Sequence, residues 1–246
     1  MLKYPDQEAA TIVARCDLRV GDGAWRYAET HRAAIDENWR RSLEANPAYF
    51  NGIIHLIDEL HLDESGLGAR FLRTGFKSYL HWRRAGFPET GVLDGFGSAL
   101  IRSADGAILL GRQRAGNVNA GLAYLPGGFI DSRDVAADGC IDITASIVRE
   151  LQEETGLSKA DLHPLPGFLI TQTTAHVSIA VTFEVNLDAE ALKTRIEQHI
   201  AADPDSELTD IVIVRHLADL DGLAMPQYAR VLLPQMLSPV RQDAKA

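Results

Sequence analysis

The stretch that decides the fold is 149-RELQEETGL-157. On a helix, which turns by about 100° per residue, Glu150, Glu153 and Glu154 project from one face because their spacing is i, i+3, i+4. Leu151 lies on the apolar side, which suits packing against a sheet. Three carboxylates on one face repel one another, and a hard divalent cation removes that repulsion. The stretch therefore predicts an amphipathic helix whose oxygen ligands favour Mg²⁺ or Mn²⁺ over zinc.

An acidic helix face can also be merely solvated, because glutamate is a good helix former. The surrounding sequence favours a site. Upstream, 124-YLPGGFID-131 contains two adjacent glycines, which allow close backbone approach. The helix is expected over residues 143–155 and to stop at Gly156, a favourable C-terminal residue. The glycine pair and the acidic face together indicate a functional site and not merely a solvated helix face.

The composition limits the class of protein. The 246-residue chain is 46% hydrophobic and 24% charged, which is ordinary for a globular protein. With 24 Lys and Arg against 34 Asp and Glu, its net charge is −10, which argues against a nucleic-acid partner. Cys16 and Cys140 form no zinc or disulfide motif. No run approaches the roughly 18 apolar residues of a membrane span, and the first residues lack a signal-peptide pattern. We expect a cytoplasmic protein that binds a small molecule and no membrane.

A Gly- and Pro-rich segment, 84-RAGFPETGVLDG-95, separates two regions of different texture. We place the boundary at residue 90, with an N-terminal α/β extension over 1–90 and the main domain over 91–246. The mixture of elements predicts an α/β (α+β) fold. Strands are expected at 46–62 (after a turn), 69–74, 96–103, 107–113, 165–172, 176–185 and 208–217, and helices at 28–46, 75–84, 143–155, 188–201 and 226–237.

Leu125-Pro126-Gly127-Gly128, followed by residues 149–157, resembles the Nudix box, G-x5-E-x7-R-E-U-x-E-E-x-G-U, where U is aliphatic. The second half of this pattern is matched in full. The resemblance covers roughly residues 92–237. It implies an α/β/α sandwich with a mixed sheet, dependence on Mg²⁺, and hydrolysis of a nucleoside diphosphate linked to another moiety.

The first half of the box departs from the pattern. The family separates its first glycine from its arginine by 13 residues, whereas 20 residues lie between Gly128 and Arg149. Ile141 occupies the position of the family's first glutamate. We expect Asp142 or Asp138 to pair with Arg149 instead. Asp142 is equally suited to be the N-cap of the helix.

The resemblance assigns roles residue by residue. Glu150, Glu153 and Glu154 would be the metal ligands, and Glu150 could also be the base that prepares the water. The backbone carbonyl of Gly127 or Gly128 would add a further oxygen. Arg149 would hold the helix carboxylates, so the predicted catalytic residues are Arg149, Glu150 and Glu153.

Other residues are candidates for contacts around the site. Arg112 and Arg114, two apart on a strand, point to the same side and could grip a diphosphate; the alternative is a solvated strand edge. Tyr124 could stack on a base or simply pack in the core. Glu207 is a candidate general base, with an exposed loop residue as the alternative. His176 is expected to be structural.

The N-terminal region carries no catalytic motif. Its segments 46-NPAYFNG-52 and 74-TGFKSYLHWR-83 are similar to the region that precedes the Nudix core in some UDP-sugar diphosphatases. This likeness would make the substrate a nucleotide sugar, with uridine as the leading base. The alternative is a subdomain that packs on the core or forms a homodimer.

The sequence thus predicts a Mg²⁺-dependent Nudix pyrophosphohydrolase that releases a nucleoside monophosphate. The alternative is a non-catalytic protein of the same fold that binds or senses a nucleotide sugar, which the missing glutamate at Ile141 suggests. A DNA-binding regulator would need a basic helix-turn-helix segment, and the sequence shows none.

Overall fold

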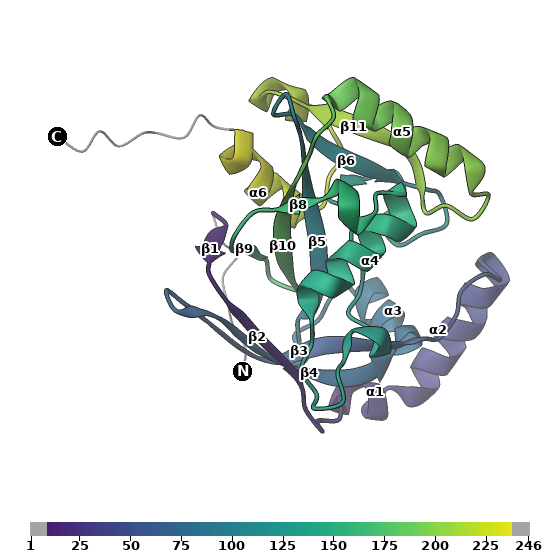
Figure 1. Cartoon of the computed structure of the whole chain (residues 1–246). Coiled ribbons are helices and arrows are strands. Elements are labelled where there is room, and N and C mark those ends of the chain that lie inside the picture. Colours follow the sequence, from purple (N-terminus) through teal and green to yellow (C-terminus); the bar gives the residue numbers. More distant parts are fainter. Residues whose placement is uncertain (1–8, 238–246) are drawn as a thin grey trace.

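The computed structural model describes residues 9–237, and its centre is a mixed sheet of eight strands (Figure 1). The strand order is β1-β9-β10-β5-β6-β11, with β7 beside β6 and β8 beside β10. The neighbours β5 and β10 are parallel, and the other pairs are antiparallel. The strands are β1 (Thr11–Val13), β5 (Asp94–Ser103), β6 (Ile108–Gln113), β7 (Ala123–Tyr124), β8 (His163–Pro164), β9 (Phe168–Gln172), β10 (His176–Val185) and β11 (Leu208–Val214).

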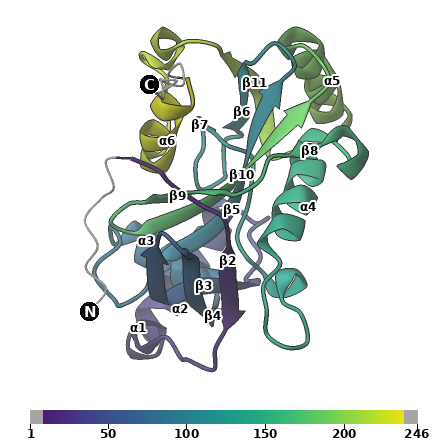
Figure 2. The ribbon, with the colours of Figure 1, turned by 60° about the vertical axis from the view of Figure 1, so that its left-hand side comes forward.

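Helices cover both faces of this sheet (Figure 2). Successive residues of β5 face opposite sides. Ile101 packs in the core with α4 (Ile143–Thr155) and α5 (Ala189–Ala202), whereas Leu100 packs in the core with α6 (Gln227–Leu237). The predicted α/β/α sandwich with a mixed sheet is confirmed, and α4 has the predicted bounds.

A second, three-stranded sheet comes from the N-terminal region, with order β2-β4-β3. Its strands are β2 (Cys16–Val20), β3 (Ile53–Asp63) and β4 (Gly66–Gly75), and its helices are α1 (Arg26–Thr30), α2 (Arg32–Ala45) and α3 (Phe76–Arg84). The single helix predicted over 28–46 is divided at His31. The same region also supplies β1 to the main sheet, where it pairs with β9. The domain boundary at residue 90 therefore stays a prediction.

The small sheet holds the segment that lengthens the box. Val20 N–H donates to the Gly139 carbonyl (2.9 Å), Ile141 N–H donates to the Leu18 carbonyl (2.9 Å), and His55 N–H donates to the Ile130 carbonyl (3.0 Å). Both ends of the extra segment are thus fixed by backbone hydrogen bonds to β2 and β3.

Within residues 9–237, no helix combines the length and apolar character that crossing a bilayer requires.

The packing of the small sheet against the main sheet can be tested by a substitution in the core between them. Phe71 on β4 is fully buried, and a Cβ placed on Gly95 of β5 would lie 2.9 Å from its ring. We predict that Phe71→Ala lowers the free energy of unfolding by about 3–5 kcal/mol in denaturant titrations, because it leaves a cavity at this junction. Phe50→Ala is the control, since Phe50 is 80% exposed. Equal losses for the two variants would contradict this packing.

Candidate active site

A cavity of about 1150 Å³ lies between the main sheet and the N-terminal helices, and its volume suits a nucleotide-sized ligand. Charged side chains and glycines of the box form part of its wall, whereas aromatic side chains from both regions form another part. The charged and glycine part of the wall includes Gly127, Gly128, Arg133, Glu150 and Glu207. The aromatic part includes Tyr79, Phe87, Phe96 and His176, with Asp94 among them.

Glu154 is the most deeply buried carboxylate of the acidic helix, at 6% exposure. The Tyr124 hydroxyl donates to its Oε1 (2.5 Å), and the Gly127 N–H donates to its Oε2 (3.0 Å). Burial raises the pKa of Glu154 to about 8, with Glu207 and Glu150 adding to the rise. Tyr124 packs in the core, one of its two predicted roles, and its hydroxyl also holds this carboxyl group.

Glu150 lies one turn earlier and lines the cavity. Its carboxylate pairs with Arg149, yet burial still raises the pKa of Glu150 to about 7. A Cβ on Gly128 would lie 2.3 Å from Glu150 Oε2, so any larger residue there would displace this carboxylate from its present position.

Gly127 passes close over β5. Its φ of +156° favours glycine, and a Cβ there would lie 2.2 Å from the Gly97 carbonyl oxygen. The Pro126 carbonyl accepts from Ala99 N–H (2.7 Å), which anchors the loop to the strand edge. The predicted need for two glycines beside the acidic face thus has a steric cause.

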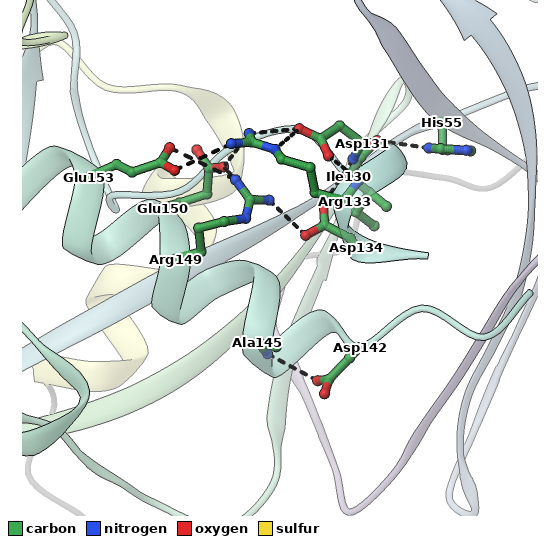
Figure 3. Close-up of polar contacts among 10 residues, drawn as sticks. All are labelled: His55, Ile130, Asp131, Arg133, Asp134, Asp142, Ala145, Arg149, Glu150 and Glu153. Carbon is green, nitrogen blue, oxygen red and sulfur yellow. Dashed lines mark hydrogen bonds and ion pairs between the residues drawn. The ribbon is translucent and has the colours of Figure 1, made fainter. Parts of the chain in front are cut away.

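Arg149 pairs with Asp134, not with Asp142 or Asp138 as predicted (Figure 3). Its Nη2 lies 2.6 Å from Asp134 Oδ1, and the Asp134 side chain is only 3% exposed. Asp142 is the N-cap of α4, accepting from Ala145 N–H (3.0 Å), and Asp138 accepts from Cys140 N–H (3.0 Å). The short 3₁₀ turn at Ser132–Asp134 brings Asp134, and neither Asp138 nor Asp142, to Arg149 on the helix.

Arg133, in the same turn, was not singled out by sequence reasoning. Its guanidinium pairs with Asp131 (2.7 Å) and with Glu153 (3.3 Å) and lies 3.8 Å from Glu150. Its side chain is 58% exposed and lines the cavity. The extra segment therefore supplies a cation beside the acidic face.

Arg112 and Arg114 do not line the cavity. Arg112 pairs with Asp210 (3.2 Å), and Arg114 donates to the Pro204 carbonyl (2.6 Å). The residue between them, Gln113, faces the cavity, as strand alternation requires. The two arginines do share one side, but the structure does not bring that side to the acidic residues.

Glu207 is an exposed loop residue before β11, as the alternative predicted, and it also lines the cavity, as a general base would have to. Desolvation raises the pKa of its carboxyl group, and the nearby charge of Glu153 adds to the rise.

The donor set fits a hard divalent cation. Among residues 9–237, no three acidic, histidine or cysteine side chains converge as a ready-made metal centre, since Glu150 and Glu153 turn to arginines and Glu154 to Tyr124. The available donors are nevertheless all oxygen, which Mg²⁺ prefers. The raised pKa values of Glu150 and Glu154 show incompletely compensated buried charge, which a cation would compensate.

The aromatic part of the cavity contains a second buried carboxyl group, that of Asp94. The Tyr79 hydroxyl donates to its Oδ2 (2.8 Å), and His176 Nε2 lies 3.8 Å from the same oxygen. Burial raises the pKa of Asp94 to about 7. No sequence pattern pointed to Asp94, because the two residues beside it come from distant segments.

Comparisons with known proteins agree with the box. The NUDIX domain model matches residues 94–226, just over half of the chain. No protein with curated function matches the sequence. Similar solved structures include a MutT protein from Methanosarcina mazei Go1 (24% identity, 59% of this chain and 90% of that one, TM-score 0.38). Another is an Ap4A hydrolase from C. elegans, a binary complex (15% identity, 59% and 93%, TM-score 0.37). A third is the Nudix hydrolase RenU from M. smegmatis (19% identity, 56% and 79%, TM-score 0.36).

The roles of the two aspartates predict different losses of stability. Asp134→Ala should lower the free energy of unfolding by about 3 kcal/mol, because it leaves Arg149 partly buried without its main partner. Asp142→Ala should cost about 1 kcal/mol, the usual value for losing an N-cap. Chemical denaturation measures both. An equal or reversed order would show that Asp134 does not hold Arg149.

Proposed function

The chain belongs to the Nudix family, and from that premise we propose that it is a Mg²⁺-dependent pyrophosphohydrolase acting on a nucleoside diphosphate linked to another moiety. The observation that carries the proposal is the position of Glu150, a carboxylate of the box, in the wall of a cavity of nucleotide size, with Glu153 and Glu154 on the same helix. Burial raises the pKa values of Glu150 and Glu154, and such perturbed groups gather at functional sites.

Glu150, Glu153 and Glu154 would hold the metal, Mg²⁺ or alternatively Mn²⁺, and the carbonyl of Gly127 or Gly128 would add an oxygen. A bound divalent cation supplies Lewis-acid stabilisation of phosphate oxygens and lowers the pKa of a coordinated water. Arg133, which lines the cavity beside Glu153, would be placed to meet the diphosphate.

The chain's own residues prepare this chemistry. Asp134 fixes Arg149, and Arg149 in turn orients Glu150. Tyr124 and the Gly127 N–H hold Glu154 in one orientation. Glu150 or Glu207 would accept the proton of the attacking water, since both line the cavity and have raised pKa values. The products would be a nucleoside monophosphate and a phosphorylated second product.

A nucleotide sugar is the proposed substrate class. Residues of the N-terminal region, including Asn51, Phe76 and Tyr79, line the same cavity as Glu150. The N-terminal region therefore does more than pack on the core, because it forms part of the wall against which a ligand would lie. This placement supports the likeness of that region to the UDP-sugar diphosphatases.

The alternative of a non-catalytic binder rested on the missing glutamate at Ile141. Asp134 now provides a carboxylate partner for Arg149. The missing glutamate at Ile141 therefore no longer favours a non-catalytic binder over an enzyme.

The test is a panel of substrates with Mg²⁺: UDP-sugars, ADP-ribose, CoA, dinucleoside polyphosphates and nucleoside triphosphates. We predict selective release of a nucleoside monophosphate. Glu153→Gln and Glu154→Gln should each lower kcat by about 100-fold or more without unfolding the protein, because each removes a charge that holds the metal.

Glu64→Gln is the matched control, since Glu64 is exposed at the turn between β3 and β4, and it should keep full activity. Near-normal turnover in both acidic-face variants would overturn these assignments. Ligand binding without turnover in any divalent metal would favour the non-catalytic protein.

A further inference from the structure

Asp94 has an unused hydrogen-bond acceptor inside the cavity wall. It begins β5 directly opposite His176, which begins the parallel strand β10. Its side chain is 4% exposed. Oδ2 accepts from Tyr79, whereas Oδ1 has no hydrogen-bond partner among the described residues. Burying an acceptor without a donor is unfavourable. Because Oδ1 itself is closed to solvent, a ligand in the cavity meets it only when the Asp94 side chain turns toward the cavity that the residue lines.

Aromatic rings line the same cavity as Asp94. Phe87 packs edge-on against the His176 ring at 4.7 Å between centroids, and Phe96 packs against Tyr228 at 5.0 Å. All four residues line the cavity with Asp94. An apolar, aromatic wall with one oriented acceptor matches a planar heterocycle that has an N–H on its edge.

Arg83 also lines the cavity, but its hydrogen bonds go to Val118 and Asn119. Its guanidinium donates to the Val118 carbonyl (2.6 Å) and Asn119 Oδ1 (3.1 Å) and lies over the Phe87 ring. Burial is the largest cause of the raised pKa of Asp94, and the Tyr79 hydrogen bond and the charge of Arg83 offset it only in part. His176 and Tyr79 both approach Oδ2, so Oδ1 is left without a partner among the described residues.

The acceptor and the acidic face are within reach of one nucleotide. Gly127 approaches β5 at Gly97, three residues after Asp94. At about 3.3 Å per residue, this separation along the strand is roughly 10 Å. A ligand with its diphosphate near Gly127 and Glu150 would place its base beyond the ribose, toward Asp94.

We propose that Asp94 accepts a hydrogen bond from a ring N–H of the substrate's nucleobase and thereby determines which bases the cavity takes. The favoured bases have a ring N–H beside a carbonyl group, as uracil and guanine do and adenine and cytosine do not. This inference rests on the proposed function, because a diphosphate at the acidic face is what directs the base to Asp94.

The experiment measures binding without divalent metal, so that it does not depend on turnover. Isothermal titration compares UMP with N3-methyl-UMP, and GMP with 1-methyl-GMP, on the wild-type protein. We expect the unmethylated member of at least one pair to bind about 10-fold more tightly, the effect of one hydrogen bond to a buried acceptor.

Two variants separate the hydrogen bond from steric exclusion of the methyl group. Asp94→Ala removes the acceptor and opens space for the methyl group, so the preference should vanish or reverse. Tyr79→Phe removes the neighbouring donor but keeps the acceptor, so the preference should persist.

If the methylated and unmethylated ligands of both pairs bind the wild-type protein equally, the proposal is overturned. This result does not depend on whether any variant folds. A preference that survives Asp94→Ala, or the absence of saturable binding by UMP and GMP, would also overturn it. Loss of the preference in Asp94→Ala, in a protein that hydrolyses none of the panel, would instead overturn the proposed function and keep the base contact.

Discussion

The ion pair between Arg149 and Asp134 is the interaction on which the site depends. Glu150, Glu153 and Glu154 lie within little more than one helical turn, and their mutual repulsion destabilises α4 unless it is offset. Arg149 provides that positive charge beside Glu150, and Asp134 fixes its direction from a separate segment. Because Asp134 is almost completely buried, the turn that bears it must stay in place for the acidic face to keep its arrangement.

The N-terminal region keeps that turn in place. Backbone hydrogen bonds from β2 and β3 hold the segment that contains Asp134, and side chains of α3 complete the cavity wall. The extra residues of the box therefore connect the main domain to the small N-terminal sheet through backbone hydrogen bonds. One arrangement thus links the aromatic residues that line the cavity to the carboxylates that would bind the metal.

Local patterns carried most of what could be predicted from the sequence. The periodicity and caps of α4 give its bounds, and the glycine pair reflects a backbone approach that a Cβ would block. The partner of Arg149 could not be found in this way, because the hydrogen bonds to β2 and β3 that position Asp134 are long-range. The same applies to Asp94, whose neighbours come from α3 and β10. Arg112 and Arg114 show a further limit, since alternation predicts a shared side but not which side faces the cavity.

The central claim is that the acidic face held by Arg149 and Asp134 binds the divalent cation. A titration with Mn²⁺ followed by electron paramagnetic resonance tests it without reference to any substrate. We expect saturable binding by the wild-type protein and an affinity at least about 10-fold weaker in Asp134→Asn, because the residue that positions the ligands is altered. Unchanged affinity in Asp134→Asn, or no saturable binding by the wild-type protein, would contradict it.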